Sequence, residues 1–243
     1  MSLTVHINHS ADINELATRY KCFEFLKNTF VSTDDCNKWY MTDEYWNLNN
    51  DIIYQLQVMF IGKTGYGKST TLNKIVGRNV FESSDVEVCT KDLYSANYKI
   101  NKNRNQFLAL SDLPGIGESN DADNHYYEWY RDMLQKSHCV VYVLRADQRD
   151  FAVDEILFRE MFNTPKERDK VILALNYADK IEPLNRKLGL SVEQISNLNK
   201  KIKDISRIFN MPTKNILYYS AMDNINMDVL AQRISDKLKN QLY

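Results

Sequence analysis

The sequence lacks the features that mark secreted, membrane-spanning and polyanion-binding proteins. Its 31 basic and 32 acidic residues give a formal net charge of -1, so the bulk charge points to neither nucleic acid nor an anionic membrane as partner. No apolar run approaches the roughly 18 residues that a membrane span needs, and the amino terminus lacks a basic, apolar signal sequence. We therefore expect a soluble protein of the cytoplasm without a membrane span.

Cysteine is also scarce. The four cysteines are widely scattered, and no two of them form a CxxC pair. This spacing favours neither a zinc site nor a disulfide framework. Hydrophobic residues nevertheless make up 44% of the chain and aromatic residues 12%, which is typical of a protein with a packed core.

The chain divides near residue 52. In residues 1–51 the apolar positions between Ile13 and Phe30 recur at helical spacing, and Asp12 and Glu15 stand where a helix N-cap and its capping-box partner would stand. The aromatic-rich stretch after this helix predicts a loop or short helices that pack on the main domain. We interpret residues 1–51 as an N-terminal helical extension.

Residues 52–243 alternate short apolar runs with helical patterns. The expected strands are at residues 54–61, 94–100, 106–111, 139–144, 171–176 and 215–219. The expected helices are at residues 69–76, 126–135, 154–162, 191–209 and 227–242, while 164–169 and 183–188 are expected to be loops. The alternation predicts an α/β three-layer sandwich whose six-stranded sheet is mostly parallel, with one antiparallel strand at its edge.

The strongest motif is Gly-Lys-Thr-Gly-Tyr-Gly-Lys-Ser at residues 62–69, a full match to G-x-x-x-x-G-K-[ST] between a predicted strand and a predicted helix. Glycines let backbone N–H groups approach phosphate oxygens, and the helix N-terminus adds partial positive charge. Lys68 would then reach the β- and γ-phosphates, and Ser69 would offer its hydroxyl to Mg²⁺. The motif predicts a P-loop protein that binds a nucleoside triphosphate.

A second motif, Asp-Leu-Pro-Gly, follows the strand that ends near residue 111. Asp112 would hold Mg²⁺ through water, and the N–H of Gly115 would sense the γ-phosphate. The polar stretch 116–126 suits a switch that orders when the triphosphate binds. Upstream, Thr90 would place its hydroxyl on Mg²⁺ and its amide near the γ-phosphate.

Two further strand ends carry residues suited to reading a base. Asn176 and Asp179 follow the strand at 171–176, and a carboxylate there accepts from guanine N1–H and N2–H₂ together, a donor pair that adenine lacks. Asn176 would tie this loop to the phosphate loop. A backbone N–H at Ser220 or Ala221 would meet the guanine carbonyl.

The order of these motifs resembles the Ras-like G domain of the translation-factor-related GTPases, and most of all the Era-like group with its bacterial and prophage-encoded members. The stretches Asp-Leu-Pro-Gly-Ile-Gly-Glu-Ser at 112–119, Arg-Ala-Asp at 145–147 and Val-Asp-Glu at 153–155 carry the closer likeness. The resemblance covers residues 52–243. It implies a GTP/GDP and Mg²⁺ site with Ser69, Thr90 and Asp112 on the metal. The nucleotide contacts that it implies are Gly62, Lys63, Thr64, Gly65, Tyr66, Gly67, Lys68, Ser69, Thr70, Asn176, Asp179, Ser220 and Ala221.

The chain departs from the family's pattern in two places. The usual N-K-x-D has become Asn-Tyr-Ala-Asp, so Tyr177 or a folded-back Lys180 would have to cover the base. Potassium-binding members carry an asparagine in the phosphate loop where this chain has Gly65, so potassium-stimulated hydrolysis is not expected.

The residue after Gly115 is Ile116, where Ras-like proteins place the glutamine that orients water. We therefore expect slow intrinsic hydrolysis, with Lys68, Thr90 and Gly115 as the catalytic set. Other groups that could orient water or act as an arginine finger are Glu118, Ser119, Asn120, Arg78, Arg104, Arg145 and Arg149.

The leading hypothesis is a slow Mg²⁺-dependent GTPase that acts as a molecular switch. A GTP-dependent scaffold or homodimer with negligible turnover remains an alternative, as does a trans-acting activator that supplies the missing group. A ribosome- or RNA-associated assembly GTPase is a third reading. The basic face Lys200, Lys201, Lys203 and Arg207 is more typical of a solvated helix than of an RNA site, and nucleic acid stays open as a partner.

Overall fold

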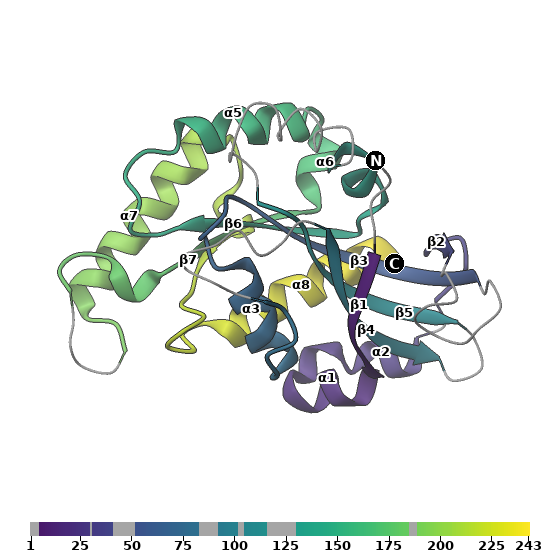
Figure 1. Ribbon diagram of the computed structural model, residues 1–243. Helices are drawn as coiled ribbons and strands as arrows, with labels where there is room; N and C mark the ends of the chain where they lie inside the picture. The colour runs from purple at the N-terminus through teal and green to yellow at the C-terminus, as the bar shows by residue number, and fades with distance from the viewer. Residues whose placement is uncertain are drawn as a thin grey trace.

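The computed structural model describes residues 5–29, 31–40, 52–82, 92–101, 105–115, 130–184 and 189–243. In this part of the chain eight strands form one sheet in the order β1-β4-β5-β3-β6-β7-β8, and β2 pairs with β3 (Figure 1). The strands are β1 (Val5–Asp12), β2 (Asn37–Tyr40), β3 (Ile52–Ile61), β4 (Leu93–Asn101), β5 (Gln106–Asp112), β6 (Cys139–Arg145), β7 (Val171–Asn176) and β8 (Ile216–Tyr218).

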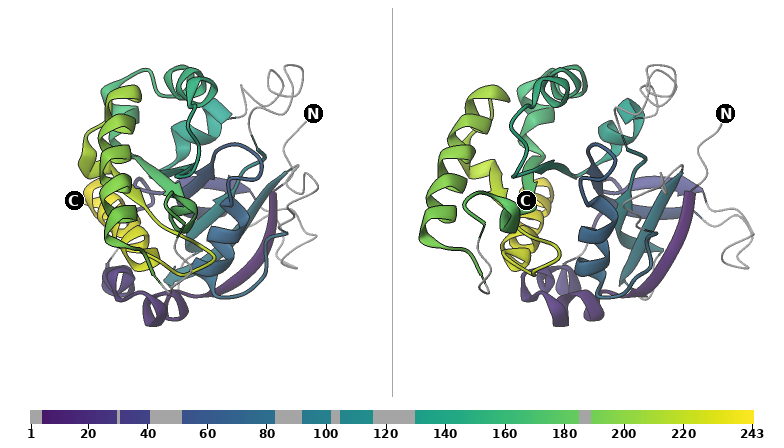
Figure 2. Two further views of the ribbon diagram at one scale, coloured as in Figure 1. Left: turned by 90° about the vertical axis from the view of Figure 1, so that its left-hand side faces the viewer. Right: turned by 60° about the vertical axis from the view of Figure 1, so that its left-hand side comes forward.

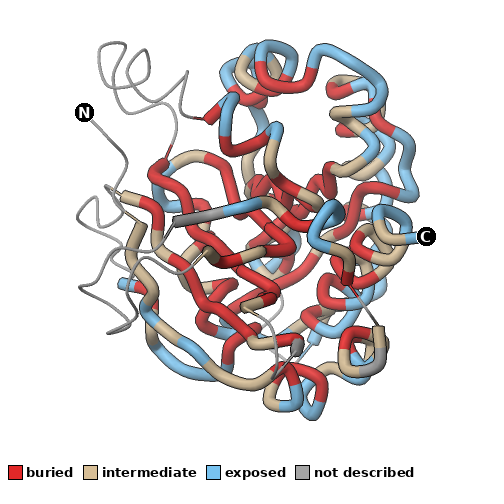
Figure 3. Tube along the Cα trace, turned by 90° about the vertical axis from the view of Figure 1, so that its right-hand side faces the viewer, coloured by how far each residue is buried: buried red, intermediate tan, exposed pale blue. Residues whose placement is uncertain are grey.

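The central strands are parallel, and they are buried on both faces. β3 runs parallel to β5 and β6, and β7 runs parallel to β6 and β8. All seven residues of β5 and all six of β7 are buried, as their apolar runs require of strands covered on two sides. Figure 3 shows this buried band through the middle of the molecule. The carboxyl ends of β3, β5, β6 and β7 therefore meet along one edge of a rigid sheet.

Helices cover both faces of the sheet. On one side lie α1 (Ile13–Arg19), α2 (Phe25–Asn28), α3 (Lys68–Val76) and α8 (Met227–Leu242), and on the other lie α5 (Ala152–Met161) and α7 (Val192–Ile208), as Figures 1 and 2 show. The shorter elements are α6 (Pro165–Asp169), η1 (Lys21–Phe23), η2 (Ala178–Lys180) and η3 (Thr213–Asn215). The expected α/β sandwich is confirmed. None of the helices described is both long and apolar enough to cross a membrane.

The predicted hairpin of β4 and β5 is present and antiparallel, but β4 is not the edge of the sheet. β1 pairs with β4 in parallel, with Val5 opposite Leu93, and Figure 2 shows β1 in purple along the outer side of the sheet. The sheet thus has eight strands where six were expected, because residues before 52 contribute two of them. β1 satisfies backbone groups of β4 that would otherwise face solvent.

The N-terminal segment contains both helices and strands. Asp12 caps α1 as predicted, its carboxylate accepting from the Asn14 N–H at 2.9 Å. Glu15 does not complete a capping box; it lies 3.3 Å from Arg78 instead. The segment expected to be a loop or short helices includes strand β2. The predicted domain boundary near residue 52 stays a prediction.

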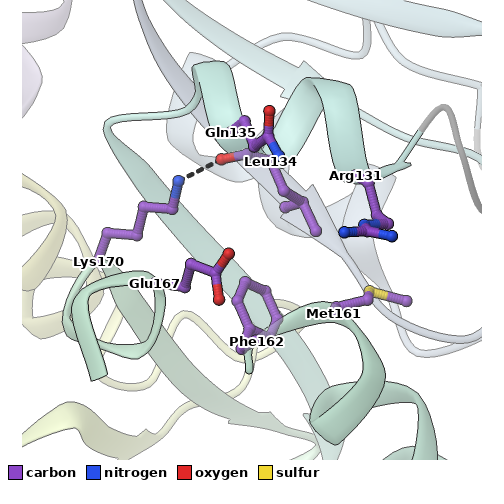
Figure 4. Close-up of a pocket in the computed structure, with 7 residues that line it drawn as sticks. All are labelled: Arg131, Leu134, Gln135, Met161, Phe162, Glu167 and Lys170. Atoms are coloured by element: carbon purple, nitrogen blue, oxygen red, sulfur yellow. Dashed lines mark hydrogen bonds between the residues drawn. The ribbon is translucent and has the colours of Figure 1, made fainter. Parts of the chain in front are cut away.

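Residues 164–169, expected to be a loop, form the short helix α6. Thr164 caps it in a full capping box with Glu167, and Pro165 stands at the first helical position, where a missing N–H costs nothing. After it, Lys170 donates to the Leu134 carbonyl at the end of a helical segment at 130–136 (Figure 4). A cation suits the negative end of the helix dipole, so this contact fixes the 130–136 helix beside α5 and α6.

His138 joins three parts of the chain just before β6. Its Nδ1 accepts from the backbone N–H of Gln57 at 2.9 Å, and its Nε2 lies 2.7 Å from the carbonyl oxygen of Asp35. These partners require a neutral ring with the proton on Nε2. Burial lowers the pKa of His138, although the bond to the Asp35 carbonyl opposes the shift.

We predict that His138 makes the stability of the fold depend on pH. Because its folded-state pKa lies below the unfolded value, the unfolded chain binds the proton more readily, so the contribution is complete above about pH 6.5 and falls as the pH drops below it. Urea unfolding at about pH 7.5 and about pH 5.5 measures this slope. His138→Asn keeps an acceptor near Gln57 and cannot titrate, so its slope should be smaller; a slope equal to that of the wild type would contradict the prediction.

Candidate functional site

The phosphate loop joins the carboxyl end of β3 to the N-terminus of α3. Gly67, the N-cap of α3, has a φ of 84°, and a Cβ built on it would lie 2.4 Å from the side-chain nitrogen of Asn176. Only glycine fits both the left-handed backbone and this close approach. The first N–H groups of α3 follow directly, and such groups at a helix N-terminus form a natural anion site.

Lys68 lies under the phosphate loop. It is 6% exposed, and its Nζ donates to the carbonyl oxygens of Gly62 at 3.0 Å and Lys63 at 3.2 Å. The loop therefore wraps around a buried ammonium group, and the acceptor in each of these two contacts is a neutral carbonyl. An anion that entered the loop would gain from this charge.

Ser69 and Asp112 lie together at the next strand end. The Ser69 hydroxyl donates to the Asp112 carboxylate at 2.5 Å. Asp112 ends β5 beside β3 and is 1% exposed. The structure thus brings together two of the three predicted metal residues.

Gly115 lies against the phosphate loop. A Cβ built on it would fall 1.9 Å from the hydroxyl oxygen of Thr64 and 2.8 Å from the Thr64 amide nitrogen. Any larger residue would push the two loops apart. The backbone of the Asp-Leu-Pro-Gly turn is therefore adjacent to the loop that would hold the phosphates.

Asn176 connects three loops. Its side-chain N–H donates to the Tyr66 carbonyl at 3.0 Å, and its side-chain oxygen accepts from the Ala221 N–H at 3.1 Å. It is 3% exposed. The predicted tie between this loop and the phosphate loop is present in the structure.

Asp179 carries a carboxylate with one oxygen in need of a donor. Its Oδ2 lies 3.4 Å from Nζ of Lys180, and its Oδ1 is buried without a hydrogen-bond partner among the described residues. Leaving a buried acceptor unpaired costs about 1–3 kcal/mol. Such an oxygen suits a ligand that brings its own N–H groups.

The two amides expected to meet a guanine carbonyl already have acceptors within the protein. Ser220 N–H donates to the Ile225 carbonyl at 3.0 Å, and Ala221 N–H donates to Asn176. Whether either N–H meets a guanine carbonyl stays a prediction. Short-range sequence could not reveal the acceptor of Ala221, because it comes from the distant strand β7.

Tyr177 replaces the lysine of the usual base-reading motif and contacts the phosphate loop directly. It has a φ of 60°, and its hydroxyl donates to the Gly65 carbonyl at 3.3 Å. The guanidinium of Arg145 lies 4.4 Å from the centre of its ring, and Arg145 forms a two-point ion pair with Asp147. The hydrogen bond that Arg145 donates to Asp147 raises the pKa of Arg145. Burial would raise the pKa of Asp147, but the bond and charge of Arg145 bring it below its ordinary value.

Two side chains of the phosphate loop contact residues in the first turn of α5 or just before it. Lys63 pairs with the buried carboxylate of Asp154 at 2.9 Å, and the Tyr66 hydroxyl donates to Gln148 at 2.5 Å. Burial and the charge of Asp154 raise the pKa of Tyr66. Sequence reasoning placed both residues on the phosphates and missed Asp154 and Gln148, whose only sequence signal was their place in or near the Arg-Ala-Asp and Val-Asp-Glu stretches.

The remaining predicted residues are partly outside the described chain. Thr70 lies within α3 directly after Ser69, and Arg78 is paired with Glu15. Those that lie outside the described residues are Thr90, Arg104, Ile116, Glu118, Ser119 and Asn120.

Comparisons with known proteins agree with this geometry. Residues 57–177 match the model of a family described as 50S ribosome-binding GTPase. The chain is 29% identical to YfjP, an uncharacterized protein of Escherichia coli K12, over 214 residues, which cover 88% of this chain and 73% of YfjP.

Two solved structures share the fold. Toc33 from Arabidopsis thaliana in complex with GDP and Mg²⁺ superposes with a TM-score of 0.58 at 19% identity, covering 77% of this chain and 86% of Toc33. An Era variant from Aquifex aeolicus bound to GDP·AlF₄⁻ superposes with a TM-score of 0.58 at 22% identity, covering 76% of this chain and 57% of Era. At these identities the likeness concerns the fold.

We predict that Asn176 holds the site together mechanically. Asn176→Ala leaves the Tyr66 carbonyl and the Ala221 N–H without their bonds, so the free energy of unfolding should fall by about 1–3 kcal/mol. Urea unfolding measures this. Asn197→Ala, which removes a single exposed bond to Glu182, is the matched control and should change stability by less than about 0.5 kcal/mol. Equal stability of the two variants would contradict the role of Asn176.

Proposed function

We propose that the chain is a GTPase of the family that its residues 57–177 match, and that it binds Mg²⁺·GTP and hydrolyses it slowly as a molecular switch. The observation that carries this proposal is the meeting of Lys68, Ser69 and Asp112 at the end of a preformed phosphate loop. The residues present fit the nucleotide and the metal ion.

The phosphate side fits a triphosphate with a divalent cation. Lys68 lies within the loop and would attract the β- and γ-phosphate oxygens, while the first N–H groups of α3 would donate to them. Ser69 and Asp112 offer oxygen atoms, which Mg²⁺ prefers, and their present 2.5 Å contact brings both within reach of one ion. Bound there, Mg²⁺ would neutralise charge that develops on the phosphates.

The base side fits guanine. The buried Oδ1 of Asp179 lacks a partner, and guanine N1–H and N2–H₂ would give the Asp179 carboxylate two donors where adenine gives none in that arrangement. Asn176 would hold the loop of Asp179 at a fixed distance from the phosphate loop through its bond to Tyr66.

Tyr177 takes the place of the family's lysine. Its bond to Gly65 holds the ring against the phosphate loop, and Arg145 covers the ring at 4.4 Å. A planar ring beside the base loop offers a stacking surface to a nucleobase. Because Arg145 is engaged by Tyr177 and Asp147, it is not available as an arginine finger.

Slow turnover follows from the apolar Ile116 after the switch glycine, since an aliphatic side chain cannot orient water. Lys68 would stabilise charge on the transferred phosphoryl group, Gly115 would lie near the γ-phosphate through its contact with Thr64, and Thr90 would complete the metal site. Switching would consist of ordering residues 112–126 around the triphosphate and releasing them after hydrolysis.

A second function is a GTP-dependent homodimer in which a partner supplies the missing group. For Toc33, dimerization is described as important for GTPase activity. Arg149 is exposed and lies in the segment between β6 and α5, so it is the best placed of the described arginines to act in trans. A ribosome-associated role is the third reading, and the family description supports it. The basic face on α7 supports RNA binding less well, because one of its lysines, Lys201, donates to the Gln148 carbonyl.

We predict guanine selectivity that depends on Asp179. Titration of wild type with fluorescent GDP and Mg²⁺, in competition with ATP, should show guanine binding that ATP does not displace. Asp179→Asn replaces an acceptor with a donor, so GDP should bind roughly tenfold to a hundredfold more weakly, while xanthosine diphosphate, with a carbonyl at C2, should bind more tightly. Asp223→Asn in the neighbouring exposed loop is the control. Displacement by ATP, or equal binding by both variants, would refute the base assignment.

We predict that single-turnover GTP hydrolysis distinguishes a switch that acts alone from a GTP-dependent homodimer. A switch that acts alone should give a slow rate that is independent of protein concentration, whereas a dimer should hydrolyse faster as concentration rises. If Arg149 acts in trans, Arg149→Ala should abolish the concentration-dependent part, since an arginine finger is worth about 10³–10⁵ in rate. Arg207→Ala, an exposed arginine on α7, should leave it unchanged. A rate that is slow and independent of concentration in all three proteins would exclude a dimer in which the partner supplies the missing group.

A further inference from the structure

A buried carboxylate lies beneath the phosphate loop. Asp154, in the first turn of α5, has a side chain that is 0% exposed. Its Oδ2 lies 2.9 Å from Nζ of Lys63, and it accepts from the Tyr66 hydroxyl at 3.2 Å and from the side-chain N–H of Gln148 at 3.5 Å. Its Oδ1 is buried and has no hydrogen-bond partner among the described residues.

A carboxylate in such a place has to be compensated. Removing a charge from water costs several kcal/mol, and only a close opposite charge with further hydrogen bonds offsets this. Lys63 supplies the charge, Tyr66 and Gln148 supply donors, and the first turn of α5 adds the positive end of its dipole. The cluster therefore has a strong preference for one arrangement, and two of its four members are residues of the phosphate loop.

Tyr66 is held at both ends as a result. Its carbonyl accepts from Asn176 on the base side, and its hydroxyl reaches Gln148 and Asp154 on the α5 side. Lys63 is held by its ammonium group, and its ammonium also lies 5.8 Å from the centre of the Tyr66 ring. The backbone between these two anchors is the stretch whose N–H groups would face phosphates.

We propose that Asp154 is a positioning residue for the phosphate loop: through Lys63 and Tyr66 it fixes the loop backbone in the shape that binds phosphate. It does not touch the nucleotide, because it lies on the buried side of the loop. The proposal rests on the function proposed above and deepens it, since it makes α5 the support of the phosphate site.

The support continues to α7. Lys201 donates to the Gln148 carbonyl, and its ammonium lies 5.4 Å from the centre of the Phe151 ring. The segment that carries Gln148 is thereby fixed between α5 and α7. The loop's shape therefore depends on two helices that are remote from it in sequence.

The test compares Asp154→Asn with Glu155→Gln in the full-length chain. Asparagine keeps the shape of Asp154 and removes its charge, whereas Glu155 lies next to it on α5 and forms an ion pair with Arg159 on the same helix. Hydrogen exchange of the nucleotide-free proteins should show roughly tenfold faster exchange of the amides of residues 63–69 in Asp154→Asn alone, with the strands β6 and β7 unchanged. A merely structural role would accelerate exchange throughout the chain.

Nucleotide affinity provides the second measurement. The dissociation constant for fluorescent GDP should rise roughly tenfold in Asp154→Asn and stay at the wild-type value in Glu155→Gln. In the double variant Lys63→Met/Asp154→Asn the loss should be smaller than the sum of the single losses, because the two side chains act on the loop as one pair.

The outcomes separate the two proposals. If wild type fails to bind GDP, the proposed function is wrong, and the exchange measurement still decides the role of Asp154. If wild type binds GDP and Asp154→Asn matches Glu155→Gln in exchange and affinity, the positioning role is wrong. Should Asp154→Asn fail to fold, Tyr66→Phe, which keeps the ring and removes the hydroxyl, should show the same local acceleration to a smaller extent, and its absence would overturn the proposal.

Discussion

The rest of the site depends on the amide of Asn176, which bonds to the phosphate loop with one end and to the loop after β8 with the other. A side-chain amide can do this because it carries a donor and an acceptor on a planar group. Its position at the end of a strand buried on both faces gives it almost no freedom. Three loops that come from distant parts of the chain are therefore joined at one residue whose own backbone is fixed by the sheet.

The sheet positions the functional residues, and the loops at its edge carry them. Parallel strands bring their carboxyl ends to one edge, which is where open α/β sheets bind ligands. Asp112 and Asn176 end β5 and β7, and Lys68 follows β3. Each functional side chain thus ends or follows a strand that is packed in the core, and the distances between these side chains are set by the spacing of the strands.

Sequence patterns predicted the parts of the molecule whose information is local. The phosphate loop, the strand before it and the helix after it were found because each has its own signal in consecutive residues, and the capping Asp12 was found in the same way. The contacts that could not be predicted join residues far apart: Lys63 and Asp154 are separated by 91 positions, and the acceptor that occupies the Ala221 amide lies 45 positions away. The helix at 165–169 was missed for a different reason, since five residues are too few for a periodic pattern to show.

The pairing of β1 with β4 has a consequence for how the chain folds as it is made. β1 precedes the phosphate loop and α3 in the chain, whereas its partner β4 follows them; His6 in β1 contacts Asp92, the residue before β4, and the two are 86 positions apart. Until β4 emerges, β1 can form no bond of the final sheet. Closing so long a loop is a slow, entropically costly step. The sheet that carries the phosphate loop is therefore incomplete on that side until β4 has been made and has paired with β1. Synthesis rate and folding are thereby coupled through a strand whose partner lies beyond the phosphate loop in the chain.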